Sequence, residues 1–570
     1  MKIKILVMAF ILSFILVGCE NSEENTTNED KATSAINSEY INLTMEKPKT
    51  LNPLTNNQKS VGYIMNLIYD GLFTIDQNYN VVPQLVEEYG LAQDGMSIDI
   101  KLKDAKWHDG KSVTSEDVRF TIELLHKYVD SPYSVFAENI SSISIKNNKE
   151  FTIIFKEKYP FSVERLIFPI VSKDNITSLE NSDVNNADNN LIGNGPYKIE
   201  DYEERQGMVL SLNEDYYQEL KTNSKGIQVE VVPDEEAQVS MVIALRSDIA
   251  NVSLNDLSKF YQSEFNITTY EGRDYESLIF NYDNPFLRDV NFRKAIASCI
   301  NRNKILEEGY MSDATLVDFP LNTKSKYYNK ENKQFAYNVD KAKKYLENVK
   351  PISDKQIQDM QKEKELQQSQ DETKPEELNI ANNKDTNTTS EDKTSKEDVK
   401  SEDKVENESN IKEKISQLNL KIIVNKENSE RLKSAYLISS DLESIGINST
   451  INELSSEEMS TAINNKDYDI ALVGWELSSV PDAINIIQSS GYTDEKLTNY
   501  ITSLLGATTP KQISDIYNSI QKYVNQNVLF MSLVIRDDYI VSNRRLEGDI
   551  APNDFDVYEG ISNLNIEYKK

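Results

Sequence analysis

Hydrophobic and polar positions alternate along this chain with the period of a β-strand in some segments and of an α-helix in others. Residues 97–103 place Ile98, Ile100 and Leu102 on one side of an extended chain, which predicts a half-buried strand. The Thr-Ser-Glu-Asp sequence at 114–117 has the capping-box pattern that opens a helix. The pattern therefore predicts both kinds of element within the first 130 residues.

Two later segments carry the same signals. Asp289 is placed to cap a helix whose apolar residues, including Cys299, recur at helical spacing, so we interpret Cys299 as a core residue. Residues 418–424 predict a strand, residues 431–445 a helix that ends at a glycine, and residues 447–451 another strand. Together these segments predict one strand-helix-strand unit.

A short apolar run at residues 470–473 ends in Gly474 and Trp475, and a Ser-Ser-Val-Pro turn follows. The run predicts a buried strand that delivers one large aromatic side chain to the edge of a sheet. One interpretation is a wall of a binding site. The other is an ordinary core strand with a core tryptophan, which is the usual role of such runs.

The amino terminus has the layout of an export signal. Lys2 and Lys4 precede an apolar run over residues 5–17, and Gly18 and Cys19 follow it. The ending resembles a bacterial lipoprotein signal, which implies removal of residues 1–18 and lipid on Cys19. An ordinary secretory signal or a single-helix anchor is the alternative. Residues 19–38 are polar and acidic, which predicts a disordered tether.

Composition narrows the classes of function. The 62 Lys and Arg residues stand against 93 Asp and Glu, a net charge of −31, which argues against a nucleic-acid partner. Two histidines and two cysteines argue against a zinc-type metal site and a disulfide framework. Residues 351–410 contain no aromatic residue and no glycine, which predicts a disordered insert.

Four motifs follow one another over about seventy residues. They are Leu-Asn-Pro at 51–53, Tyr-Asp-Gly-Leu-Phe at 69–73, Val-Pro-Gln-Leu at 82–85 and Lys-Trp-His-Asp-Gly-Lys-Ser-Val at 106–113. In this order they resemble the solute-binding proteins of ABC importers in the oligopeptide and dipeptide-binding family. The resemblance implies an α/β, two-lobe periplasmic-binding-protein-like fold of the large peptide-binding type, with a discontinuous first lobe and hinge strands.

The resemblance also implies where the lobes begin and end. The first lobe is expected at 39–277 and includes a family-specific subdomain at about 55–185. The second lobe is expected at 278–475 and contains the insert at about 351–410. Residues 476–570 are expected to return to the first lobe.

The implied function is that of a receptor on the outer face of the cytoplasmic membrane. It would capture a small solute, foremost an oligopeptide, between its lobes and deliver it to the permease subunits of an ABC importer. It would act as a monomer, without a cofactor, and be held to the membrane by lipid on Cys19. The alternatives are a receptor for a non-peptide solute and a surface lipoprotein that acts as a sensor or interaction partner. The sequence contains no nucleophile or phosphate-binding motif, which argues against an enzyme.

Five ligand-binding candidates follow from the resemblance. Trp475 matches a Gly-Trp of the family, Tyr197 ends its Gly-x-Gly-Pro-Tyr turn and lies in either the core or the cleft, and Asn281 ends a strand as either a cleft residue or a turn former. Peptide-binding relatives place an aspartate about three residues past the tryptophan, where it pairs with the ligand's α-ammonium. Here that position is Ser478, and Asp482 is the nearest acid that could replace it.

Overall fold

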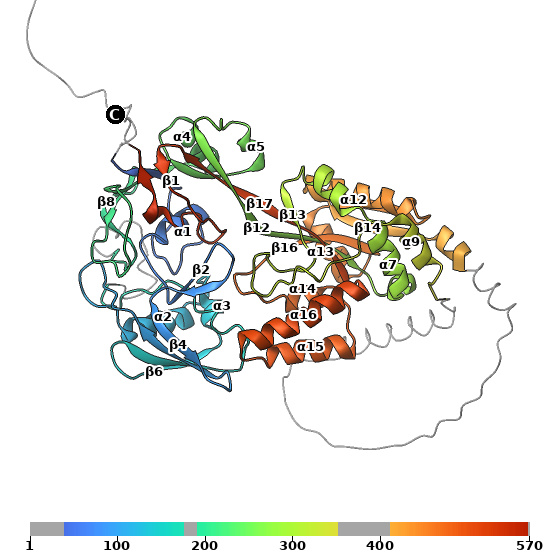
Figure 1. Cartoon of the computed structure of the whole chain (residues 1–570), viewed down its shortest axis with the longest axis horizontal. Helices are drawn as coiled ribbons and strands as arrows, with labels where there is room; N and C mark the ends of the chain where they lie inside the picture. Colours follow the sequence, from blue (N-terminus) through green and yellow to red (C-terminus); the bar gives the residue numbers. More distant parts are fainter. Residues whose placement is uncertain (1–38, 176–190, 351–410, 568–570) are drawn as a thin grey trace, which may run out of the picture.

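The computed structural model describes residues 39–175, 191–350 and 411–567. Two lobes lie beside each other, and two long antiparallel strands, β12 (Phe265–Phe280) and β17 (Phe530–Asn543), run from one lobe into the other (Figure 1). The predicted two-lobe α/β fold with hinge strands is therefore confirmed. The signal at 1–18, Cys19, the tether at 19–38 and the insert at 351–410 lie outside the described residues.

One seven-stranded sheet passes through both lobes. Its order is β11-β17-β12-β16-β14-β15, and β13 pairs with β17 beside this path. Its other strands are β11 (Ile249–Val252), β13 (Ala314–Leu316), β14 (Asn419–Asn425), β15 (Asn448–Leu454) and β16 (Ile470–Glu476). With 16 residues, β12 is about 50 Å long, enough to belong to the cores of both lobes.

The first lobe contains two four-stranded sheets. One has the order β1-β10-β9-β8 and the other the order β4-β5-β7-β6. Their strands are β1 (Ile41–Glu46), β8 (Tyr197–Glu203), β9 (Gly207–Leu212), β10 (Gly226–Val232), β4 (Val86–Leu91), β5 (Ser97–Leu102), β6 (Ile140–Ile145) and β7 (Glu150–Phe155). The first lobe also contains α1 (Lys59–Met65), α2 (Ser115–Lys127), α3 (Ser134–Ala137), α4 (Glu235–Ile243), α5 (Leu254–Leu257), β2 (Phe73–Ile75), β3 (Val81–Pro83), β18 (Leu546–Glu547), η3 (Ile561–Asn563) and β19 (Asn565–Ile566).

The predicted helix start at residue 114 is confirmed in atomic detail. The Asp117 carboxylate accepts hydrogen bonds from the backbone N–H of Thr114 at 2.9 Å and from its hydroxyl at 2.7 Å. This satisfies donors that would otherwise be unpaired at the start of α2. The predicted strand at 97–103 is β5, with Ile98, Ile100 and Leu102 buried as the alternation requires.

The second lobe is built around the predicted strand-helix-strand unit. It runs from β14 through α12 (Ser429–Glu443) to β15, and α7 (Val290–Cys299) packs in the same core. The further helices of this lobe are α6 (Pro285–Arg288), α8 (Arg302–Lys304), η2 (Ile305–Gly309), α9 (Val339–Leu346) and α13 (Ser456–Asn464). The Asp289 side chain caps α7, as predicted, and Cys299 is a buried free thiol whose pKa is raised by burial.

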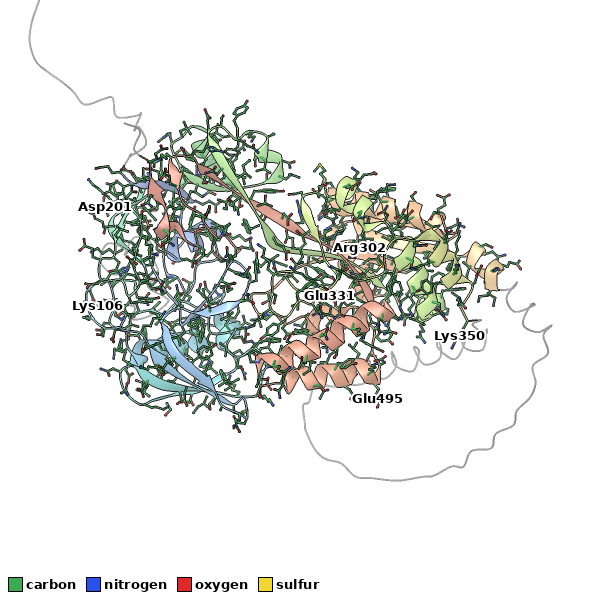
Figure 2. All side chains as sticks on the ribbon, in the orientation of Figure 1. Lys106, Asp201, Arg302, Glu331, Lys350 and Glu495 are labelled. Atoms are coloured by element: carbon green, nitrogen blue, oxygen red, sulfur yellow. The ribbon has the colours of Figure 1, made fainter. Side chains whose placement is uncertain are left out.

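Three helices follow β16 before the chain enters β17. The helices α14 (Ile484–Ser489), α15 (Glu495–Leu505) and α16 (Pro510–Asn527) bury their apolar faces in one core with second-lobe strands β14 and β16 and with Phe161 of the first lobe. The assignment of residues 476–529 to the first lobe stays a prediction. After α16 the chain crosses between the lobes along β17. In Figure 2, Lys106 and Asp201 mark the first lobe and Arg302 the second.

Arg293 holds the second-lobe end of β17 in place. Its side chain is buried, and its guanidinium donates only to backbone carbonyls, including those of Asn527 and Val528 at the end of α16 at 2.9 Å each. Its other donors bond the carbonyls of Leu287 and Arg288 at the end of α6. Carbonyls at helix ends carry partial negative charge, which compensates the buried cation.

We expect Arg293→Ala to lower the free energy of unfolding by about 3–5 kcal/mol, because several buried carbonyls lose their donor at once. Arg293→Lys keeps the charge but loses the forked set of donors, so its free energy of unfolding should lie between those of the wild type and Arg293→Ala. Denaturant unfolding measures the change. The control is Arg246→Ala, which removes an exposed pair with Glu230 and should cost less than about 0.5 kcal/mol. Equal effects of Arg293→Ala and the control would contradict this role.

Candidate functional site

The lobes meet at a hollow of about 440 Å³ beside the hinge strands. Its lining comes from Tyr79 of the first lobe, from Arg273 on β12 and from two loops of the second lobe. The loop residues are Pro320, Leu321, Asn322, Ser325 and Leu477 to Asp482, with Ile486 from α14. A hollow with walls from both lobes changes shape when the lobes move relative to each other, so it is the candidate ligand site.

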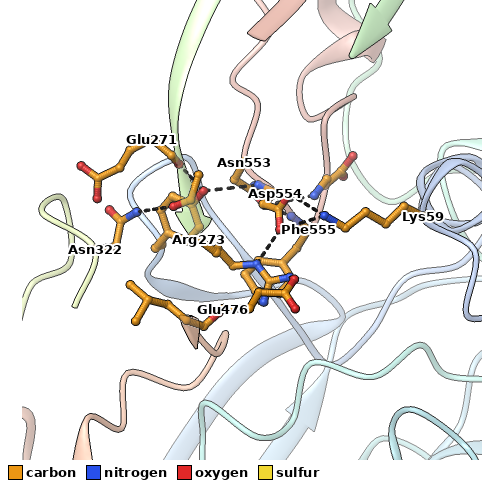
Figure 3. Close-up of polar contacts among 12 residues, drawn as sticks. Lys59, Glu271, Arg273, Asn322, Glu476, Asn553, Asp554 and Phe555 are labelled. Carbon is orange, nitrogen blue, oxygen red and sulfur yellow. Dashed lines mark hydrogen bonds and ion pairs between the residues drawn. The ribbon is translucent and has the colours of Figure 1, made fainter. Parts of the chain in front are cut away.

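Arg273 connects the two sides of this hollow. Its Nε lies 2.6 Å from Oδ2 of Asp554 in the C-terminal loop, and its Nη1 donates to the carbonyl of Leu477 at 2.8 Å. Its Nη2 pairs with Glu476 at the end of β16 (Figure 3). The guanidinium also lies 4.2 Å from the centre of the Phe555 ring. One hinge residue therefore binds first-lobe and second-lobe groups together.

Lys59 extends this cluster into the first lobe. Its Nζ lies 3.1 Å from Oδ1 of Asp554, so the Asp554 carboxylate takes one cation on each oxygen. Asp554 is nearly buried, whereas Lys59 is largely exposed. A buried carboxylate between two cations is compensated in charge, so Asp554 positions Arg273 and has no free oxygen for a ligand ammonium.

The hinge itself is irregular at this point. The pairing of β12 with β17 shifts register between Glu271 and Tyr275, next to Arg273. The Tyr79 hydroxyl donates to the carbonyl of Glu271 at 2.5 Å, and the backbone N–H of Thr323 donates to its carboxylate at 2.6 Å. Burial raises the pKa of Glu271. Both lobes thus hold the irregular segment from either side.

Trp475 stands next to the hollow on β16. Its ring is half-buried, and its centre lies 6.1 Å from that of Tyr275 at an interplanar angle of 34°. It packs with Leu477 and Ile486, which do line the hollow. Its role in ligand binding stays a prediction.

Gly474, the residue before Trp475, is required by a buried ion pair. The Arg431 side chain donates to both carboxylate oxygens of Glu276, from Nε at 2.7 Å and from Nη2 at 2.8 Å. A Cβ at position 474 would overlap the Arg431 guanidinium. The glycine therefore lets a salt bridge cross the face of β16 directly behind the tryptophan.

Ser478 and Asp482 both line the hollow, as the sequence analysis expects of cleft residues. The Ser478 hydroxyl accepts the backbone N–H of Val480 at 3.1 Å and is exposed. The Asp482 carboxylate accepts the hydroxyl of Tyr159 at 2.6 Å and the backbone N–H of Ile484 at 2.9 Å. Each oxygen of Asp482 therefore already has a donor, and one donor belongs to the first lobe.

Two other candidates do not lie at this hollow. Tyr197 is completely buried in the first-lobe core, which is one of the two locations that its sequence allows, and so it is not a cleft residue. Asn281 ends β12 at the far side of the second lobe, where its amide donates to the carbonyls of Lys466 at 2.9 Å and Tyr468 at 2.7 Å. Its side-chain oxygen accepts the N–H of Asp283. Asn281 is thus a turn former, the alternative that its residue type allowed.

The sequence analysis missed Arg273, Lys59 and Asp554. Asp554 lies 281 positions from Arg273, and neither residue stands in a motif. The one local signal is an arginine after a glycine within a strand, which indicates a break in regular pairing.

His108 has backbone partners on both ring nitrogens, and His126 has one on Nε2. Nδ1 of His108 accepts the N–H of Gly193 at 3.2 Å, and its Nε2 lies 3.1 Å from the carbonyl of Gly195. Burial lowers the pKa of His108 to about 4. Nε2 of His126 lies 2.9 Å from the carbonyl of Ala137. In the described parts of the chain no three His, Cys, Asp or Glu side chains are grouped to hold a metal ion.

We expect Gly474→Ala to destabilise the protein by about 2–4 kcal/mol, because the added methyl group displaces the Arg431 guanidinium from Glu276. The matched control is Gly90→Ala on β4, where a Cβ meets no atom within 4 Å. That change should be neutral or slightly stabilising. Thermal unfolding of the two variants separates the effects, and equal melting temperatures would contradict the steric argument.

This chain matches one family model and resembles several known proteins. Residues 80–498 match the family model of bacterial extracellular solute-binding proteins, family 5 Middle. The oligopeptide-binding protein AppA of Bacillus subtilis is 23% identical over 94% of both chains. The nickel-binding protein NikA of Staphylococcus aureus is 29% identical over 49% of this chain and 55% of its own. The structure of HbpA2 from Haemophilus parasuis superposes with a TM-score of 0.71 at 16% identity, over 93% of this chain and all of that one.

The family match starts within the expected subdomain, includes the hinge strand β12 and β13 to β16, and ends in the first turn of α15. It therefore includes most of the residues that line the interlobe hollow. The chain belongs to the bacterial extracellular solute-binding proteins of family 5, and it is a solute receptor for an ABC importer rather than an enzyme.

Proposed function

We propose that the solute is an oligopeptide, and that the receptor works as a monomer held to the outer face of the membrane by lipid on Cys19. The observation that carries the peptide assignment is the hollow between the lobes, where exposed loop backbone and paired charges stand side by side. Peptides bind through main-chain hydrogen bonds, and the loop backbone in this lining offers partners for them. The similarity to an oligopeptide-binding protein over 94% of both chains supports the same ligand class.

Two observations favour a peptide over a nickel complex. His108 uses both ring nitrogens and His126 uses Nε2 on backbone groups, and neither histidine lines the interlobe hollow. The nickel-binding relative matches about half of each chain, whereas the oligopeptide-binding relative matches nearly all of both.

Closure follows from the position of Arg273. The residue lies where the β12–β17 pairing is irregular, and it binds both Asp554 of the first lobe and Glu476 of the second. A ligand that binds between the lobes adds contacts to the closed arrangement and so shifts the population toward it. The closed form is what a permease would receive.

Lipid anchoring is supported by the Leu-Val-Gly-Cys ending of the signal-like segment. Within the described ranges, no helix combines the length and the apolarity that a membrane crossing needs. Mass spectrometry of the protein from a bacterial host tests the anchor. A diacylglyceryl-modified Cys19 as the first mature residue is the expected result, and an unmodified amino terminus would contradict it.

We expect a pool of short peptides to raise the melting temperature of the lipid-free protein, because a ligand that binds only the native state stabilises it. At a concentration of about 100 times Kd the gain is about 2.7 kcal/mol. Nickel ions, alone or with histidine, should give no shift. Arg273→Met should reduce the peptide effect, and Arg246→Ala serves as the surface control. A shift with nickel and none with peptides would contradict the proposal, and a shift with neither would favour a sensor or interaction role.

A further inference from the structure

An extended peptide carries a terminal ammonium group, and a cleft that encloses this charge needs an anion to compensate it. The carboxylates at the first hollow are already engaged. Asp482 holds Tyr159 and Ile484, Asp554 holds Lys59 and Arg273, and Glu476 pairs with Arg273. The acid that anchors the ammonium must therefore lie elsewhere in the cleft. This inference rests on the proposed peptide function.

A second hollow, of about 770 Å³, lies on the first-lobe side of the Lys59–Asp554 bridge. Lys59 lines this hollow and Arg273 lines the first, while both bind the same Asp554 carboxylate. The two hollows are thus neighbours separated by one salt-bridged cluster. Ser60, Tyr63 and Asp538 also line the second hollow.

Two acids line this hollow, and Asp538 on β17 is the half-buried one, whereas Glu235 is exposed. Among the described residues no donor lies within hydrogen-bonding distance of its carboxylate, although the side chain is half-buried. The carboxylate lies directly over Gly272, where a Cβ would come within 2.5 Å of Oδ2. The glycine therefore leaves the space that this carboxylate occupies.

Tyr270, which lines neither hollow, supplies an unused polar group on the strand beside Asp538. It is the cross-strand partner of Asp538 in the β12–β17 pairing, so the two side chains lie on one face of the sheet. The Tyr270 side chain is 4% exposed, and its hydroxyl has no hydrogen-bond partner among the described residues. A buried hydroxyl without a partner is costly, so a ligand that satisfies it gains binding energy.

We propose that Asp538 and Tyr270 form the ammonium subsite of the cleft, in which the carboxylate and the phenol oxygen accept hydrogen bonds from the terminal –NH₃⁺ of a peptide. An ammonium group has three donors and no acceptor, which suits a carboxylate and a phenol on one face that both lack a partner among the described residues. The subsite takes the place of the acid that position 478 lacks.

The charges around Asp538 suit a cation. Lys59 approaches from α1 and Arg536 from β17, whereas Asp554 from the C-terminal loop, Asp274 from β12 and Glu235 from α4 contribute negative charge. Burial first, and then the Asp554 charge, raises the pKa of Asp538 to about 7. At neutral pH the Asp538 carboxyl group is therefore partly protonated. Binding of an ammonium group beside it favours loss of that proton.

The test compares one peptide with a free amino terminus and the same peptide after N-acetylation. We expect Asp538→Asn to weaken binding of the free-amine peptide about tenfold to a hundredfold and to leave the acetylated peptide almost unchanged. Tyr270→Phe should give a smaller loss of the same kind. The matched control is Asp482→Asn, which also removes a carboxylate from the cleft and should affect both peptides alike. Isothermal calorimetry measures both peptides against the wild type and each of the three variants.

The pH dependence gives a readout that a structural role would not produce. The wild type should prefer the free amine at about pH 7.5 and lose much of that preference at about pH 5, where the Asp538 carboxyl is protonated. Asp538→Asn should show little preference at either pH. Because it removes a buried charge, this variant should also melt at or above the wild-type temperature near pH 7.5.

Two results would overturn the assignment of Asp538. One is an equal loss of both peptides in Asp538→Asn, and the other is an amine-selective loss in Asp482→Asn instead. If the wild type binds both peptides without preferring the amine, the subsite alone is wrong. If it binds neither peptide, the oligopeptide function fails together with the subsite.

Discussion

The antiparallel pairing of β12 with β17 is the constraint on which the rest of the structure depends. These two strands belong to both lobes, and the second-lobe strands β16 and β13 pair directly with them. A continuous sheet resists sliding between the lobes but bends where its register is broken. The break lies between Glu271 and Tyr275, so the bending point, Arg273 and the ligand hollow coincide.

Arginines that are buried or largely buried fix the elements around this hinge. Arg293 binds helix-end carbonyls where the chain enters β17, and Arg431 binds Glu276 behind β16. Arg302 binds Asp318 at 2.7 Å and the carbonyls of Val317 and Ser532. Each cation is costly to bury alone and becomes favourable only in one arrangement of its partners. The ends of the hinge strands are therefore held rigidly while the irregular segment between them retains freedom.

Local patterns predicted those elements whose burial alternates with a regular period. The strand β5, the caps of α2 and α7 and the β14-α12-β15 unit all follow from neighbouring residues alone. The first half of β12 could not be predicted this way, because its polar residues become strand only through pairing with β17. The lobe to which α14, α15 and α16 belong is a tertiary property too, since an amphipathic face does not specify what covers it.

The candidate site was less predictable, because its residues meet across long separations. Sequence reasoning found the loop that carries Ser478 and Asp482, since the Gly-Trp pattern marks it. It could not show that Asp482 is engaged by Tyr159, 323 positions away, or that Tyr197 points into a core. Residue type indicates which hydrogen bonds or charges a side chain offers. Its partners in the folded protein decide whether that group is available to a ligand.

The excess of negative charge and the proposed ammonium subsite act at different ranges. A net charge of −31 attracts cationic solutes over a distance of about one Debye length, roughly 8 Å at physiological salt, and so raises the rate of encounter. The Asp538 carboxylate and Tyr270 hydroxyl act only at contact, where losing a charged hydrogen bond speeds dissociation. Salt should therefore change the association rate while a substitution at 538 changes the dissociation rate. This separation distinguishes a recognition site from the general acidity of the surface.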